Sequence, residues 1–201
     1  VLSRCGPRSR SWPHCAIPLP REDSGTVKAR LFVALMLPDM VVEQVDQALD
    51  PVRTASAELR WQSPDRWHIT LAFLGDRDVG SELARFPTSF PACSDPIRVE
   101  GSGHFGPVLW LGVTSPQWLI DLAAVIQHVM RADRRRFRGH VTVARSRTRG
   151  GDRELRAAVA ALDRFASDPW TPDEVVLVRS VTGPKPTYEV IARSPLTVVG
   201  W

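Results

Sequence analysis

The chain has 201 residues, a formal net charge of +4, and 43% hydrophobic and 24% charged residues. This length allows a sizeable core without disulfide or metal cross-links, and the composition is ordinary for a soluble globular protein. No apolar run approaches the roughly 20 residues that span a membrane, so we expect no membrane association. Three widely spaced cysteines form no Cys-x-x-Cys pair, which argues against a zinc knuckle or a disulfide framework and favours a reducing cytoplasm.

The basic residues are almost all arginines. Of the 26 basic residues, only Lys28 and Lys185 are lysines. A GC-rich genome would explain this bias, and arginine forks also suit phosphate groups. The densest run brackets one short apolar strand and consists of Arg134, Arg135, Arg136, Arg138, Arg145, Arg147 and Arg149. Its position raises the expectation of contact with phosphate or nucleic acid.

Residues 1–27 differ from the rest of the chain. They are rich in proline, arginine and serine, show no periodicity and lack the apolar centre of a secretory signal. We interpret them as a disordered or non-native extension, since Val1 and Val27 are both candidates for an alternative start. Residues 28–201 are then predicted to form a single domain.

The first elements of this domain are a strand and a helix. Residues 31–37 form a continuous apolar run of strand length that Pro38 ends. Asp39 is the predicted N-cap of a helix. Its apolar stripe at helical spacing consists of Val42, Val45, Leu49 and Val52. Pro51 is expected to kink this helix or end it early.

The middle of the chain is predicted to be mostly strands. A short strand at 59–61 precedes a strand at 67–74. Residues 77–95 are poorly periodic and should contain at most a short helix. Strands at 97–105 and 108–113 then flank a Gly-Pro turn.

The second half begins with the most regular helical pattern. Ser115 is its predicted cap and Pro116 lies in its first turn. The buried stripe consists of Leu119, Leu122, Ala123, Ile126, Val129 and Met130. A strand at 139–144 follows.

A second helix and two strands complete the chain. The helix carries its apolar stripe between Leu155 and Phe165, and the strands lie near 174–182 and 187–193. The order strand, helix, strand therefore occurs twice. This weak repeat predicts an α/β protein with two similar lobes and a cleft between them.

Two His-x-Thr triplets lie 72 residues apart, one in each half. Because strand side chains alternate faces, His68 and Thr70 should point the same way, and so should His140 and Thr142. Two such pairs in similar apolar contexts predict two half-sites facing one ligand. The alternatives are that each histidine is a packed or surface residue, or that the pair binds a metal.

The triplets suit phosphoryl chemistry better than metal binding. Two imidazoles on opposite sides of a phosphodiester can act as general base toward water and general acid toward the departing alkoxide. Threonine hydroxyls two residues on would hold the non-bridging oxygens. Neither triplet has a neighbouring cysteine pair, a His-Glu-x-x-His motif or a carboxylate at ligand spacing, so we expect neither metal nor cofactor.

The segments His68-Ile69-Thr70-Leu71-Ala72-Phe73-Leu74-Gly75 and His140-Val141-Thr142-Val143-Ala144-Arg145 resemble the two signature motifs of the two-histidine phosphoesterase superfamily. The resemblance covers residues 30–196 and is closest to its bacterial and archaeal RNA 2′,3′-cyclic phosphodiesterases, also called 2′-5′ RNA ligases. It implies a bilobal, pseudo-two-fold α/β (α+β) fold in which two antiparallel β-sheets line a central cleft and helices lie outside.

The resemblance also implies the reaction and the residue roles. The reaction opens a terminal 2′,3′-cyclic phosphate to a 2′-phosphate without a metal. His68 would protonate the leaving 3′-oxygen and His140 would activate water, whereas the sequence itself does not distinguish the two. Thr70, Thr142 and Arg145 would bind the phosphate. Because Arg145 lies at an odd offset from His140, we expect a bulge near Ala144 or a side chain that curls back.

Phe105 and Tyr188 are candidates for stacking on a nucleobase, with core packing as the alternative. The expected partners are RNA ends or nucleotide 2′,3′-cyclic phosphates. No protein partner is required, so a monomer is expected. Two other functions stay open: joining of RNA ends through a 2′-5′ bond, and a binding module on the same fold that performs no catalysis.

Overall fold

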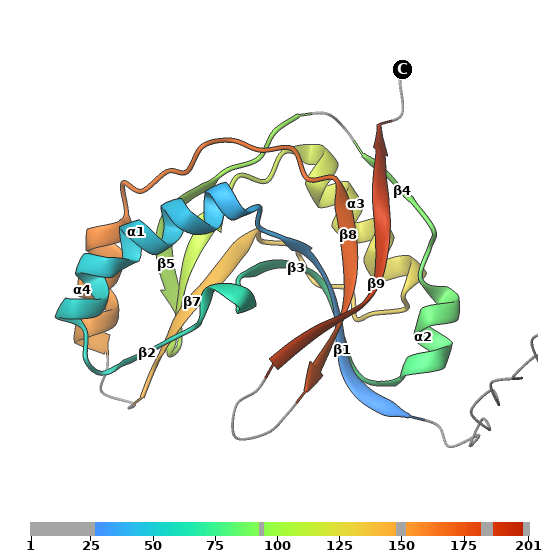
Figure 1. Ribbon diagram of the computed structural model, residues 1–201, viewed down its shortest axis with the longest axis horizontal. Helices are drawn as coiled ribbons and strands as arrows, with labels where there is room; N and C mark the ends of the chain where they lie inside the picture. Colours follow the sequence, from blue (N-terminus) through green and yellow to red (C-terminus); the bar gives the residue numbers. More distant parts are fainter. Residues whose placement is uncertain (1–26, 93–94, 148–151, 182–186, 199–201) are drawn as a thin grey trace, which may run out of the picture.

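The structure is a computed structural model that describes residues 27–92, 95–147, 152–181 and 187–198. The predicted N-terminal extension therefore lies outside the described residues, except for Val27. Within the described ranges there are four α-helices, one short 3-10 helix and nine strands (Figure 1).

The first strand and helix lie close to their predicted positions, but the helix is capped by Pro38 and not by Asp39 as predicted. Strand β1 spans Lys28–Met36 and helix α1 spans Asp39–Ala55. The helix does not end early at Pro51, because α1 continues for one more turn. Pro51 cannot donate to the Gln47 carbonyl, but both residues are exposed, so this carbonyl stays open to water.

The remaining elements of the first half are β2 (Leu59–Trp61), the 3-10 helix η1 (Pro64–Arg66), β3 (His68–Asp78), α2 (Val79–Arg85) and β4 (Phe90–Ala92). Of these, two strands and the short helix α2 were predicted, whereas the 3-10 helix and β4 were not. Strand β3 runs past its predicted end, because Gly75 adopts a positive φ of 71° and lets the strand continue.

The second half contains β5 (Val99–Phe105), β6 (Val108–Val113), α3 (Gln117–Val129), β7 (His140–Ser146), α4 (Asp152–Leu162), β8 (Glu174–Val181) and β9 (Thr187–Val198). Ser115 does not cap α3 as predicted. Its hydroxyl donates to the Val113 carbonyl at 3.0 Å, and Pro116 occupies the cap position.

The strands form one hydrogen-bonded sheet in the order β4-β9-β8-β1-β3-β7-β6-β5, with β2 beside β7. All neighbours are antiparallel except β4 and β9. The two expected half-sheets are therefore joined, and the joint is the β3–β7 contact with the matched pair Ile69 and Val141. The mixed α/β class is confirmed.

The helices are divided between the two halves of the sheet. Helices α1 and α4 lie together over the half that contains β5, β6 and β7 (Figure 1). Helix α3 packs against β3 and β4, and α2 lies beside β1 and β3. Each half of the sheet thus has helices on one of its faces.

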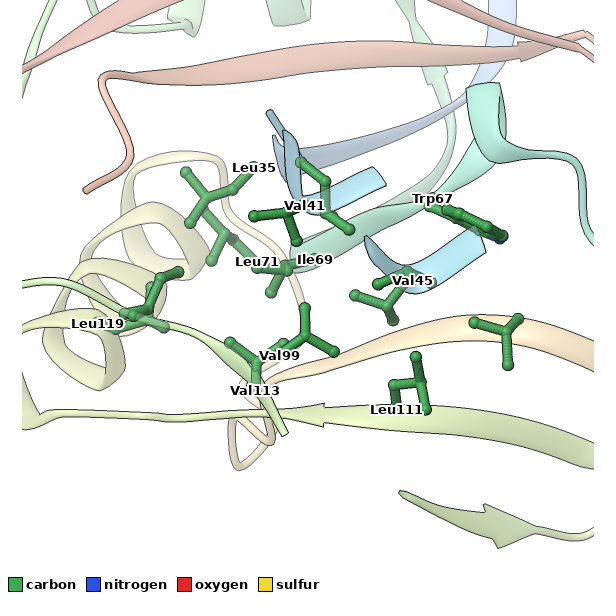
Figure 2. Packing of buried hydrophobic residues seen from close by; sticks show 14 of the residues in the cluster. Leu35, Val41, Val45, Trp67, Ile69, Leu71, Val99, Leu111, Val113 and Leu119 are labelled. Atoms are coloured by element: carbon green, nitrogen blue, oxygen red, sulfur yellow. The ribbon is translucent and has the colours of Figure 1, made fainter. Parts of the chain in front are cut away.

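The main core lies between the sheet and the helices. Figure 2 shows side chains of α1, α3 and the central strands meeting there, including Val41, Ile69, Leu111 and Leu119. A smaller apolar cluster covers the opposite face of β1 and β8 and includes Phe32 and Val178. Because strand residues alternate, burying Ile69 and Val141 in the core directs their polar neighbours to that opposite face.

Candidate active site

The two His-x-Thr triplets lie side by side at the joint between the two halves of the sheet. Ile69 and Val141 are fully buried and face one another across the antiparallel β3–β7 pair. The flanking residues His68, Thr70, His140 and Thr142 are all half-buried. In an antiparallel pair with this register, His68 lies across from Thr142, and Thr70 lies across from His140. We call the face that carries these four side chains the cleft face.

Each triplet strand contains a bulge just after its threonine. In β3, Ala34 pairs with Thr70 and Val33 with Ala72, so Leu71 is an extra residue. In β7, Trp110 pairs with Thr142 and Leu109 with Ala144, so Val143 is an extra residue. The consecutive pairs Leu71-Ala72 and Val143-Ala144 are accordingly both buried.

These bulges reverse the alternation of the strand side chains. Arg145 therefore returns to the cleft face and is exposed, as the predicted bulge near Ala144 requires. The same shift in β3 brings Phe73 to the cleft face, where its side chain is 57% exposed. Sequence reasoning did not single out Phe73, although its offset of five residues from His68 matches that of Arg145.

Both histidines are held in the same tautomer by the backbone. Nδ1 of His68 donates to the Arg66 carbonyl at 2.7 Å, and Nδ1 of His140 donates to the Arg138 carbonyl at 2.8 Å. A carbonyl oxygen only accepts, so in each neutral ring Nε2 carries the free lone pair. The repeated pattern is thus Arg-x-His-x-Thr. The two arginines are visible in the sequence, but they do not by themselves predict these hydrogen bonds.

The His68 ring lies in an aromatic corner. Its centroid is 4.7 Å from that of Phe32 and 5.3 Å from that of Tyr188. The Arg66 guanidinium covers the Tyr188 ring at 4.7 Å and donates to its hydroxyl at 3.2 Å. Tyr188 therefore packs beside the first histidine and still lines the cleft.

Burial is the main reason that the pKa of the His68 imidazole falls from 6.5 to about 4. The charges of His140 and Arg66 also lower this pKa, whereas the hydrogen bond to the Arg66 carbonyl raises it. His68 is consequently neutral at pH 7 in the free protein.

The His140 ring has aromatic neighbours as well. The Phe105 ring lies edge-on to it with centroids 5.4 Å apart, and the Trp110 ring lies at 6.3 Å. Phe105 is 50% exposed and lines the same pocket as His140, so it does not belong to the core. Each histidine therefore has two aromatic neighbours, Phe32 and Tyr188 for His68 and Phe105 and Trp110 for His140.

The two histidines line two adjoining pockets, which share Phe73, Asp133 and Arg135. The His140 pocket has a volume of about 310 Å³ and is lined by aromatic rings and arginines, among them Phe73, Phe105, Trp110, Phe137, Arg136 and Arg138. The His68 pocket has a volume of about 650 Å³ and is rich in arginine. Its lining includes Arg30, Arg66, Arg77, Arg145 and Tyr188.

The predicted site residues are divided between these pockets. Thr70 and Phe105 line the His140 pocket, whereas Arg145 and Tyr188 line the His68 pocket. Arg145 therefore projects toward the histidine of the other motif. Thr142 is half-buried and lines neither pocket.

Across the described ranges, no group of three or more histidine, cysteine or acidic side chains is arranged to hold a metal ion. Among the helices of the same ranges, none is long and apolar enough to cross a membrane.

Comparison with known families agrees with the paired motifs. A model described as the 2′-5′ RNA ligase superfamily matches residues 37–184. The chain belongs to this superfamily.

Curated relatives match at modest identity. An RNA 2′,3′-cyclic phosphodiesterase of Geobacillus stearothermophilus is 28% identical over 183 residues, which cover 84% of this chain and 58% of the relative. A second relative of the same name, from Methanothermobacter thermautotrophicus, is 30% identical over 109 residues, or 48% of this chain and 57% of the relative. The chain thus spans less than two thirds of the length of either relative.

Solved structures share the fold. The apo form of LigT from E. coli is 23% identical, with a TM-score of 0.69 over 85% of this chain and 98% of its own. The same protein complexed with phosphate is 24% identical, with a TM-score of 0.66 over the same shares. Both comparisons support the arrangement of strands and helices described above.

Proposed function

We propose that this protein is an RNA 2′,3′-cyclic phosphodiesterase that opens a terminal 2′,3′-cyclic phosphate to a 2′-phosphomonoester. One observation carries the proposal: two imidazoles on one sheet face each donate Nδ1–H to a backbone carbonyl and keep Nε2 for chemistry. Superfamily membership and the names of the curated relatives support the same reaction.

The proposed reaction needs one proton transfer on each side of the phosphorus. His140 takes a proton from water through Nε2, and the water oxygen forms a bond to phosphorus. The bond from phosphorus to the 3′-oxygen breaks, and His68 donates a proton from Nε2 to this oxygen. Each transfer is worth typically ~10²–10⁴-fold in rate. The assignment of acid and base follows the resemblance to the family.

The remaining residues bind the substrate in this proposal. The hydroxyls of Thr70 and Thr142 and the guanidinium of Arg145 hold the non-bridging oxygens, which carry the charge that develops in the transition state. Phe105 and Tyr188 offer ring faces to the bases of the RNA end. We place the reaction in the cytoplasm, because three widely spaced cysteines in the sequence indicate no disulfide framework.

The low pKa of His68 has a consequence for this mechanism. A neutral His68 cannot act as an acid, so the substrate must bring about its protonation. An anionic phosphate beside the ring favours the imidazolium and raises its pKa. Once charged, a group with a low intrinsic pKa gives its proton readily to the departing oxygen.

A product assay tests the proposed function. A short RNA ending in a 2′,3′-cyclic phosphate is incubated with the protein in excess EDTA, and 2′- and 3′-phosphate products are separated. The expected product is the 2′-phosphate, formed at the same rate with and without EDTA. Formation of the 3′-phosphate, no opening of the ring, or loss of activity with EDTA would contradict the proposal.

A further inference from the structure

Arg135 lies where the two pockets of the cleft meet. It lines both the His68 pocket and the His140 pocket, together with Phe73 and Asp133. Its side chain is 71% exposed and is paired with the Asp133 carboxylate at 3.7 Å. An exposed pair at this distance contributes little free energy, so a phosphate oxygen can replace the carboxylate.

The segment that carries Arg135 has no regular secondary structure. Residues 131–139, which we call the basic segment, run between α3 and β7, and residues 135–139 line two pockets. The ends of the segment are anchored by backbone oxygens. The Arg131 carbonyl accepts from Arg77 at 3.0 Å, and the Gly139 carbonyl accepts from the Val113 N–H at 3.0 Å.

Between these ends, the basic segment is held at Arg135 by Gln127 of helix α3. The Oε1 atom of Gln127 accepts from the Arg135 backbone N–H at 3.1 Å. The Nε2 atom of the same side chain donates to the Leu71 carbonyl at 3.2 Å. Gln127 is only 7% exposed, and a buried amide with both ends bonded has one stable orientation.

Leu71 is the extra residue of the β3 bulge. Its carbonyl lies where the hydrogen-bond ladder between β1 and β3 is locally disrupted. The equivalent carbonyl in β7 belongs to Val143 and accepts from the Gln62 backbone N–H at 2.8 Å. The carbonyl of each bulge residue thus accepts one hydrogen bond, from the Gln127 side chain in β3 and from the Gln62 main chain in β7. In addition, Gln127 links the bulge of the first motif to the basic segment.

We propose that Arg135 is a further phosphate-binding residue and that Gln127 is the positioning residue that places it. The proposal rests on the proposed function and adds a second arginine to it. Arg145 reaches the phosphate from β7, and Arg135 reaches it from the basic segment on the side of Phe73, which occupies in the first motif the position that Arg145 has in the second.

The charge distribution supports this assignment. Among the described residues, the linings of the two pockets contain six arginines besides Arg135 and one carboxylate, that of Asp133. A backbone hydrogen bond at Arg135 fixes the origin of its side chain while the guanidinium stays free to turn from Asp133 to a phosphate. Substrate affinity, rather than proton transfer, is the quantity that Arg135 and Gln127 control.

The test is a double-mutant cycle with Arg135→Gln and Gln127→Leu, with kcat and KM measured on an RNA ending in a 2′,3′-cyclic phosphate. Matched controls are Arg134→Gln, a neighbour that lines neither pocket, and Gln117→Leu, an exposed glutamine of the same helix. Arg135→Gln should raise KM about tenfold and leave kcat within twofold. The slope of log KM against log salt should fall by about 0.7, the value for one lost contact to a single strand.

If Gln127 acts through Arg135, Gln127→Leu raises KM in the same way and the double variant is no worse than Arg135→Gln. The controls should leave KM and its salt slope unchanged. Additive effects of the two substitutions, an unchanged KM in Arg135→Gln, or equal effects in Arg134→Gln would overturn the proposal.

A second Gln127 variant and a binding measurement separate loss of folding and loss of turnover from loss of phosphate binding. Gln127→Glu retains the acceptor for the Arg135 N–H and serves if Gln127→Leu does not fold; it should affect KM less than loss of Arg135. Binding of an RNA with a 2′-phosphate end, measured without turnover, should weaken in Arg135→Gln. A wild-type protein that binds this RNA but opens no cyclic phosphate contradicts the proposed function alone, whereas unchanged binding in Arg135→Gln contradicts the role of Arg135.

Discussion

Phe73 and Arg145 occupy equivalent positions in the two halves of the cleft. Each lies five residues after the histidine of its motif, and each is brought to the cleft face by a bulge two residues before it. One half therefore presents an aromatic ring where the other presents a guanidinium. The pseudo-two-fold site is symmetric in its histidines and threonines and asymmetric in its charge.

Arg145 should stabilise the phosphate in the transition state. Arg145→Gln removes a charged donor from the His68 pocket, and a charge-assisted hydrogen bond is worth about 1.5–3 kcal/mol. We expect kcat/KM on a cyclic phosphate substrate to fall roughly 10- to 100-fold. Arg145→Lys should restore part of this loss, because lysine keeps the charge but not the fork. Steady-state kinetics check this, and an unchanged kcat/KM in Arg145→Gln would remove Arg145 from the site.

The threonine hydroxyls should matter for rate and not for folding. Valine has nearly the shape of threonine, so Thr70→Val and Thr142→Val remove only a hydroxyl on the cleft face. Loss of one donor to a developing oxyanion costs about 10²–10³-fold in kcat. We expect a loss of this order in each variant, with a thermal midpoint within a few degrees of the wild type. Full activity in both variants would show that neither hydroxyl contacts the phosphate.

The pKa of His68 should rise when a phosphate is bound. It is lowered to about 4 in the free protein, mainly by burial, and an anion beside the ring opposes this effect. NMR titration of the imidazole signals, with and without a 2′-nucleotide, measures the change. His68 should titrate well above pH 4 in the complex. If its pKa stayed the same, His68 could not be the acid at neutral pH.

The same pKa shift predicts how stability depends on pH. Burial favours neutral His68 in the folded state, whereas the unfolded chain takes up its proton near pH 6.5. The contribution of His68 to stability is thus complete above pH 6.5 and is lost as the pH falls toward 4. In this window the unfolding free energy should decrease by up to about 1.4 kcal/mol per pH unit relative to His68→Gln. Denaturant titrations at several pH values measure this difference, and parallel curves for the two proteins would be the contrary result.

Periodicity and turn chemistry were sufficient to predict most elements of the fold. The apolar stripes of α1 and α3 and the strands that carry His68 and His140 lie close to their predicted positions. The paired His-x-Thr triplets on one face were also predictable, because alternation along a strand is a local property.

Features that depend on tertiary contacts were not predictable in the same way. Nothing local shows that Ile69 faces Val141, or that this pair joins the two half-sheets. In the sequence, Gln127 is an ordinary position of a predicted helix. Its side chain links the bulge carbonyl of Leu71 to the basic segment, and only the tertiary structure brings these two groups to it. Pro51 was expected to kink α1 or end it early; α1 does not end there, because exposure of the helix surface makes the missing hydrogen bond tolerable.

The central claim is that His68 and His140 act as acid and base on opposite sides of one phosphate. The most direct test compares His68→Ala and His140→Ala on an RNA 2′,3′-cyclic phosphate and on a phosphodiester with a p-nitrophenolate leaving group. Both variants should lose about 10²–10⁴-fold in kcat on the cyclic phosphate. On the second substrate, which needs no protonation of its leaving group, His68→Ala should recover most of its loss and His140→Ala should not. Equal losses on both substrates for His68→Ala, or recovery by His140→Ala instead, would contradict this account.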